Sequence, residues 1–296
     1  MVEGNDGQRM AEQEARHRAF AEAVRGKQEY ARQKEGQNLN MVEIMEMYDN
    51  VRLETMKDRL AKLFDVYSED AGKIMEGLGN IVFEMRDGWD LFDAMLSDDS
   101  SARLVTLFFK RIADNERKKA GICSIPTKFV VPPRDDLGFS KKTMERLQKN
   151  WQDFFDTLMS SGKIAIITEH ISSGRTLRYI TQELHARNIA FEIVVFSIGG
   201  IKDDLRNRGF FVDVGGVDDL MHVGLEHDAR DRIGILAFYR NKANLVQRSH
   251  DSASIHPQVN NDERERGITT RECLKDLADF MSEVVDVMEE QQLFDN

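Results

Sequence analysis

Short, continuous apolar runs separated by helical stretches limit the possible folds of this chain more than any other feature. The runs cover residues 81–83, 104–109, 164–167, 191–198, 210–212 and 233–239. Continuous rather than alternating apolar residues are typical of strands that are buried on both faces. Helical patterns at 143–159 and 175–188 lie between the runs. This alternation predicts an α/β fold with a doubly wound, mostly parallel sheet.

The N-terminal part of the chain differs from this pattern. Residues 1–65 predict a charged helical extension, and the α/β domain is expected over residues 66–245. Residues 1–38 hold seven acidic and seven basic side chains and few large apolar ones, which favours a solvated helix with no core of its own. The alternative is a helix that binds a partner through three larger side chains. These are Phe20, Val24 and Tyr30.

Residues 246–296 predict a loop followed by a C-terminal amphipathic helix. Thr269 to Glu272 offer a capping box at the expected start of that helix. Apolar residues then recur at spacings of three and four and form one stripe. They are Leu274, Leu277, Met281, Val284 and Met288. The stripe favours docking on the body of the protein, and the alternative is contact with a second copy, as in a homodimer, or with a partner protein.

The charge balance narrows the classes of partner. The 296 residues carry 41 Lys and Arg against 52 Asp and Glu, a formal net charge of −11. An acidic surface repels phosphate backbones and disfavours nucleic acid. No run of about 18 apolar residues occurs, so no membrane-spanning helix is expected. The polar first residues predict no secretory signal, and the isolated thiols of Cys123 and Cys273 suit a reducing compartment, so a cytoplasmic location is expected.

Residues 164–177 carry the strongest chemical signal. A buried strand ends in an acidic residue, Glu169, and a helix is expected to begin near Arg175. Three hydroxyl residues and a glycine lie in the loop and the first helical turn. They are Ser172, Ser173, Gly174 and Thr176. The free amides of a helix N-terminus carry partial positive charge, and glycine lets the backbone approach a ligand closely. The expected ligand is therefore a phosphate group.

This segment resembles the phosphoribosyl-pyrophosphate (PRPP) motif of type I phosphoribosyltransferases. That motif has four apolar residues, two acids, two mostly apolar residues and a Thr/Ser-Thr-Gly-x-Thr cradle. Thr168 and Glu169 take the positions of the acid pair, with threonine in place of the first acid. The resemblance implies that Glu169 binds the ribose hydroxyls and that Ser172 to Thr176 hold the 5′-phosphate. It also implies a phosphoribosyltransferase-like fold.

A second resemblance lies upstream. Arg86, Asp87 and Gly88 follow the expected strand at 81–83 and precede an expected helix through residues 91–96. They are similar to the pyrophosphate loop of the same family, in which the glycine lets backbone amides face the leaving diphosphate.

A basic segment agrees with that interpretation. Residues 101–128 contain seven basic and two acidic residues, a net charge of +5 within a chain of −11. The expected strand at 104–109 would deliver Lys110 and Arg111 to the carboxyl edge of the sheet. Cations at that edge are what a diphosphate leaving group requires.

The resemblance implies a specific reaction. Ribose 5-phosphate would pass from PRPP to a nitrogenous base, or in reverse from a nucleoside monophosphate, with pyrophosphate leaving together with Mg²⁺. Glu169 would fix the ribose, and Arg86, Lys110 and Arg111 would neutralise the diphosphate, which itself would hold the metal. One alternative is a non-catalytic regulatory or scaffold protein that binds PRPP or a nucleotide. Another is a helical interaction protein whose α/β core binds no ligand.

One further pair of residues has the spacing of a metal site. His222 and His227 could ligate a metal ion if they lay on a helix. No third ligand is apparent in the sequence, so we do not expect a metal there.

Overall fold

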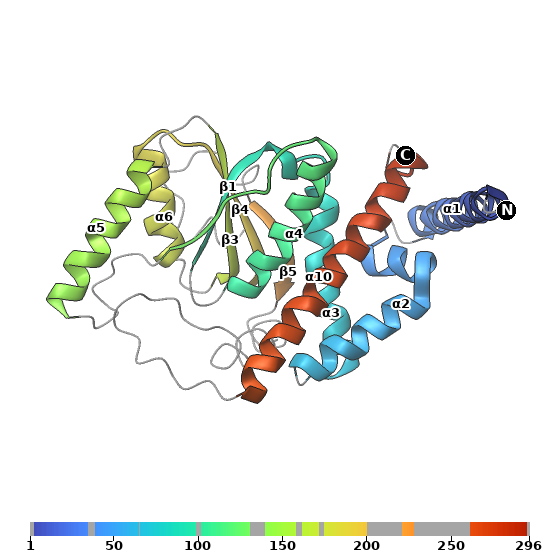
Figure 1. The fold of residues 1–296 in the computed structure, drawn as a ribbon, viewed down its shortest axis with the longest axis horizontal. Coiled ribbons are helices and arrows are strands. Elements are labelled where there is room, and N and C mark those ends of the chain that lie inside the picture. The colour runs from blue at the N-terminus through green and yellow to red at the C-terminus, as the bar shows by residue number, and fades with distance from the viewer. Residues whose placement is uncertain are drawn as a thin grey trace.

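The computed structural model describes residues 3–34, 39–64, 66–98, 102–130, 140–157, 162–171, 175–199, 221–227 and 261–294 (Figure 1). The helices are α1 (Glu3–Lys34), α2 (Met41–Phe64), α3 (Ser68–Glu84), α4 (Arg103–Lys119), α5 (Lys141–Thr157), α6 (Arg175–Ala186) and α10 (Asn261–Glu290), with a 3₁₀ turn, η1 (Trp89–Leu91). The strands are β1 (Phe92–Asp98), β2 (Thr127–Val130), β3 (Lys163–Ile171), β4 (Phe191–Gly199) and β5 (Met221–His227).

The strands of the described residues form one five-stranded sheet in the order β2-β1-β3-β4-β5. Every neighbouring pair is parallel, for example Ile166 opposite Leu96 in β1 and opposite Ile193 in β4. The predicted parallel α/β architecture is therefore confirmed, as are the strands expected at 164–167 and 191–198.

Helices cover both faces of this sheet. One face packs on α5 and α6, and the other packs on α3 and α4, with α10, α2 and α1 beyond them (Figure 1). Neighbouring residues of β3 show why the run at 164–167 is continuously apolar. Ile166 joins the cluster with α5 and α6, while Ala165 and Ile167 join the cluster on the opposite face. A strand in this position must be apolar on both sides.

Two expected strands are helical. Residues 81–83 lie in α3, and residues 104–109 lie in α4. In α4 the buried side chains continue beyond the run at helical spacing, as Val105, Phe108, Phe109 and Ile112. The run is therefore one apolar face of an amphipathic helix whose other face is charged.

Conversely, the helix expected through residues 91–96 is the strand β1, and β2 and β5 had not been expected as strands. β1 has buried side chains in succession at Met95 and Leu96, one toward each face. The expected strands at 210–212 and 233–239 lie outside the described residues.

The C-terminal stripe docks on the body, as expected. Leu274, Leu277 and Met281 are buried in the same cluster as α2, α3 and α4. The helix begins at Asn261, however, so Thr269 to Glu272 lie inside α10 and do not cap it.

The N-terminal helix differs from the expected solvated helix. Phe20 and Val24 are buried, and the Phe20 ring lies 5.1 Å edge-on from Tyr48 of α2. Tyr30 remains exposed, as do most side chains of residues 8–19. The apolar residues of α1 are therefore used within the chain, and the segments 1–65, 66–245 and 246–296 share one hydrophobic cluster.

Candidate functional site at the carboxyl edge of the sheet

The centre of the sheet contains a topological switch point. β1 has β2 on one side and β3 on the other, so the connections that follow β1 and β3 turn to opposite faces of the sheet. In parallel α/β sheets the ligand crevice lies at such a point, outside the carboxyl ends of the strands. The edge at which β1 and β3 end is therefore the candidate site, and we call it the carboxyl edge.

β3 brings a polar pair to this edge. Thr168 and Glu169 are buried, with relative exposures of 5% and 1%. They follow directly on the apolar part of the strand, and the Ser197 hydroxyl of β4 donates to the Glu169 carbonyl oxygen over 3.3 Å. A buried carboxylate on a central strand is costly, so such residues are rare outside functional sites.

The joint that follows β3 has the expected form. The strand ends at Ile171 and α6 begins at Arg175, with Thr176 in its first turn. Ser172, Ser173 and Gly174 lie outside the described residues. The first turn of α6 therefore begins four residues beyond the end of β3.

Two buried hydroxyl groups, that of Ser97 near the end of β1 and that of Thr106 in α4, form a contact that was not predicted from the sequence. The Thr106 hydroxyl oxygen lies 2.7 Å from Ser97 Oγ and 2.7 Å from the Ala102 carbonyl oxygen. Because one hydroxyl has one proton, Thr106 donates to Ala102 and Ser97 donates to Thr106. This pair fixes the start of α4 at the carboxyl edge. It could have been found only if residues 92–98 had been recognised as a strand.

Arg86, Asp87 and Gly88 do not belong to this edge. They follow α3 and precede β1, so they lie at the amino edge, where the strands begin. The Arg86 guanidinium stacks 4.3 Å from the ring centre of Phe294 and donates to the Phe83 carbonyl oxygen over 2.9 Å. The strand expected before these residues is therefore wrong, because residues 81–83 lie in α3, and that helix places Arg86 to Gly88 at the end of the sheet opposite the β3–α6 joint.

Lys110 and Arg111 are also placed elsewhere. They lie two turns into α4 rather than at a strand end. The Lys110 ammonium contacts Asp114 Oδ2 at 2.6 Å, and Arg111 holds Asp279 of α10 through two contacts of 2.6 and 3.0 Å. Partial burial raises the pKa of the Asp279 carboxyl, but the guanidinium of Arg111 outweighs this effect. The pKa of Asp279 is therefore below its ordinary value. Arg111 therefore ties α4 to α10, and Lys110, which also donates to the Ser124 hydroxyl over 2.7 Å, holds the turn that follows α4.

The ion pair between Arg111 and Asp279 allows a direct test of whether Arg111 stabilises the fold or binds a ligand. We expect Arg111→Ala to lower the midpoint of urea unfolding, and Asp279→Ala to lower it further, because Asp279 also accepts a hydrogen bond of 3.0 Å from Asn115. The double variant should be little worse than Asp279→Ala alone. If Arg111 served a ligand, only Arg111→Ala would weaken phosphate binding, and a calorimetric titration of both variants would reveal that difference.

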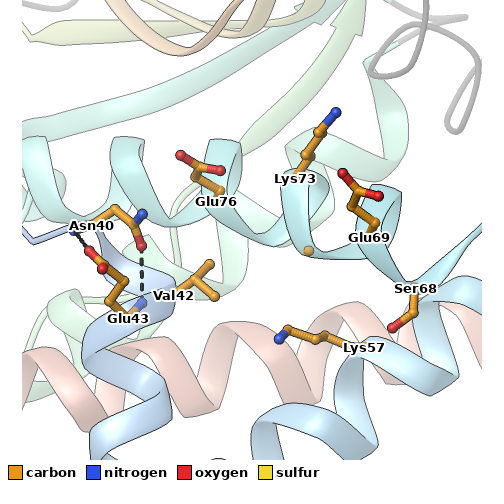
Figure 2. A pocket seen from close by; sticks show the side chains of 9 residues that line it. Asn40, Val42, Glu43, Lys57, Ser68, Glu69, Lys73 and Glu76 are labelled. Carbon is orange, nitrogen blue, oxygen red and sulfur yellow. Dashed lines mark hydrogen bonds between the residues drawn. The ribbon is translucent and has the colours of Figure 1, made fainter.

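A polar hollow of about 360 Å³ lies between α2 and α3 (Figure 2). In it, Asn40 and Glu43 exchange hydrogen bonds of 3.0 Å each between side chain and backbone, which is a capping box at the start of α2. Lys57, also in α2, pairs with Glu54 at 2.7 Å. The lining residues come from the helical layer alone, so this hollow is separate from the carboxyl edge.

His222 and His227 lie on the strand β5 and not on a helix. His222 contacts two carboxylates at the amino edge. Within the described residues, no group of three or more His, Cys, Asp or Glu side chains is arranged to hold a metal ion.

Comparison with known proteins found no matching family model, no matching curated protein and no matching solved structure. None of the helices in the described part of the chain combines the length and apolar character needed to traverse a bilayer.

Proposed function

We propose that the protein binds a phosphorylated ribose compound, PRPP or a nucleoside monophosphate, at the carboxyl edge between β1 and β3. The observation that carries this proposal is the end of β3, where buried Thr168 and Glu169 are followed by a short connection and the first turn of α6. The amides of that turn would hold the 5′-phosphate, and Glu169 would accept hydrogen bonds from the ribose hydroxyls.

Transfer of ribose 5-phosphate to a nitrogenous base, with release of pyrophosphate, is the catalytic form of this proposal. Mg²⁺ bound through the diphosphate would stabilise the leaving charge. The diphosphate itself would supply the oxygen atoms that hold the metal, so no side chain of the protein is required as a ligand. The chain would mainly orient the ribose and the phosphate.

A second candidate is a non-catalytic protein that binds the same ligand and serves as a regulator or scaffold. The positions of three cations favour it. Arg86, Lys110 and Arg111, which were expected to neutralise the diphosphate, are engaged by Phe294, Asp114 and Asp279. Binding needs only the phosphate and ribose contacts, whereas transfer also needs charge at the leaving group.

Calorimetric titration with PRPP, with and without Mg²⁺, tests the shared part of both candidates. We expect Glu169→Gln to weaken PRPP binding about tenfold or more, because it removes a charged acceptor from a buried site. Arg86→Ala is the control and should leave the affinity unchanged, since that residue lies at the amino edge.

The results of this titration distinguish the transferase from the non-catalytic regulator. No binding of PRPP or nucleotide by the unaltered protein would refute the proposal. Binding together with pyrophosphate release in the presence of a panel of bases would establish the transferase. Binding without release would leave the regulator.

A further inference from the structure

A chain of four charged groups crosses the amino edge of the sheet, far from the proposed ligand site. Lys163 of β3 pairs with Glu192 of β4, and Glu192 Oε2 lies 3.1 Å from His222 Nε2 on β5. On the other side of the ring, His222 Nδ1 lies 2.9 Å from Oε1 of Glu84, the last residue of α3. Among the described residues, Glu84 and Glu192 are the charged groups that contact the ring, and the chain as a whole joins three strands to one helix.

The geometry fixes the protonation state of the ring. Both ring nitrogens of His222 face carboxylate oxygens, which are acceptors only. A neutral imidazole has one N–H, so it can satisfy one carboxylate and must turn a lone pair toward the other. Both contacts are favourable only for the imidazolium. We propose that His222 is a pH-dependent latch that fastens the C-terminal end of α3 to the amino edge of the sheet.

The surroundings of the ring agree with this assignment. Partial burial lowers the pKa of His222, but the hydrogen bonds and negative charges of Glu84 and Glu192 outweigh it and raise the pKa above its ordinary value of 6.5. The ring is therefore charged at a pH where most exposed histidines have begun to lose their proton.

The two carboxylates differ in how readily they can be released. The Glu192 side chain is only 14% exposed and also holds Lys163, whereas the Glu84 side chain is 48% exposed. On deprotonation the remaining N–H stays with Glu192, and Glu84 turns to water. The end of α3 loses its tie, while the contacts nearer its middle remain, including the 3.1 Å hydrogen bond from the Asn80 side chain to the Gly224 carbonyl oxygen.

This latch makes stability depend on pH in a defined direction. Because the pKa of His222 is raised in the folded state, its contribution is complete below pH 6.5 and is lost as the pH rises through the folded-state value. We expect the unfolding equilibrium constant to increase by up to about tenfold per pH unit across that interval. His222→Gln should remove this dependence. His185→Gln, at an exposed position in α6, is the matched control and should keep it.

Two measurements on the unaltered protein keep the inference testable if His222→Gln fails to fold. Nitrogen NMR of the imidazole rings should show that His222 titrates above 6.5, and hydrogen exchange at the end of α3 should quicken over the same pH range while β4 stays protected. Titration of His222 at or below 6.5, or exchange at the end of α3 that does not follow its titration, would overturn the latch.

Discussion

Gly224→Ala is expected to cost about 3 kcal/mol or more of unfolding free energy, because the added methyl group would collide with backbone atoms. A Cβ at position 224 would lie 2.3 Å from the carbonyl oxygen of Gly77 in α3 and 2.7 Å from that of Phe196 in β4. Neither oxygen belongs to a side chain that could rotate away. α3 would therefore have to move off β5. Urea unfolding followed by circular dichroism measures the loss.

The control is Gly72→Ala, in α3, the helix that lies against Gly224. A Cβ there meets only the end of the Lys57 side chain, at 4.0 Å. Removing a glycine from a helix interior should then stabilise the protein by about 1 kcal/mol. Equal stability of Gly224→Ala and the unaltered protein would show that α3 does not lie against β5 as described.

Arg117→Met is expected to cost about 3 kcal/mol, because it leaves two carbonyl groups without their charged donor. Arg117 is 8% exposed, and its guanidinium donates over 2.6 Å to the carbonyl oxygens of Phe92 and Cys123. Methionine fills similar space without replacing either hydrogen bond. The start of β1 and the turn after α4 would both lose their attachment, and thermal unfolding would occur at a lower temperature.

Lys118→Met tests whether the effect is specific to position 117. Lys118 is the next residue and is exposed, so its replacement should change the unfolding free energy by less than about 0.5 kcal/mol. Similar losses from both substitutions would contradict the buried role of Arg117 and point instead to the overall charge of this segment.

The β3–α6 joint was predictable because several local signals agree there. The run at 164–167 is flanked by a polar end and a small-residue loop, and the helix after it has a clear apolar period. Each of these signals depends only on neighbours within a few residues. The positions of Thr168 and Glu169 at the carboxyl edge followed from the same local pattern.

The basic residues could not be placed in this way, because their partners are distant in sequence. Arg111 pairs with Asp279, and Arg86 stacks on Phe294. A short apolar run such as 104–109 fits a strand and a helix equally well. Its packing against α10, a segment distant in sequence, favours the helix. A strand at 104–109 would place Lys110 and Arg111 at the carboxyl edge of the sheet, whereas the observed helix places them two turns into α4.

The shared hydrophobic cluster has a consequence for the order of events during synthesis. It joins residues from Phe20 in α1 to Leu293 beyond α10, and α3 closes over β5, which is made much later. α10 covers α2 and α4, so the sides of these helices that face it stay uncovered until residues 261–290 have been made. A nascent chain that ends before α10 should expose side chains of α2 and α4 that belong to this cluster, such as Phe108, and should depend on chaperones until α10 emerges.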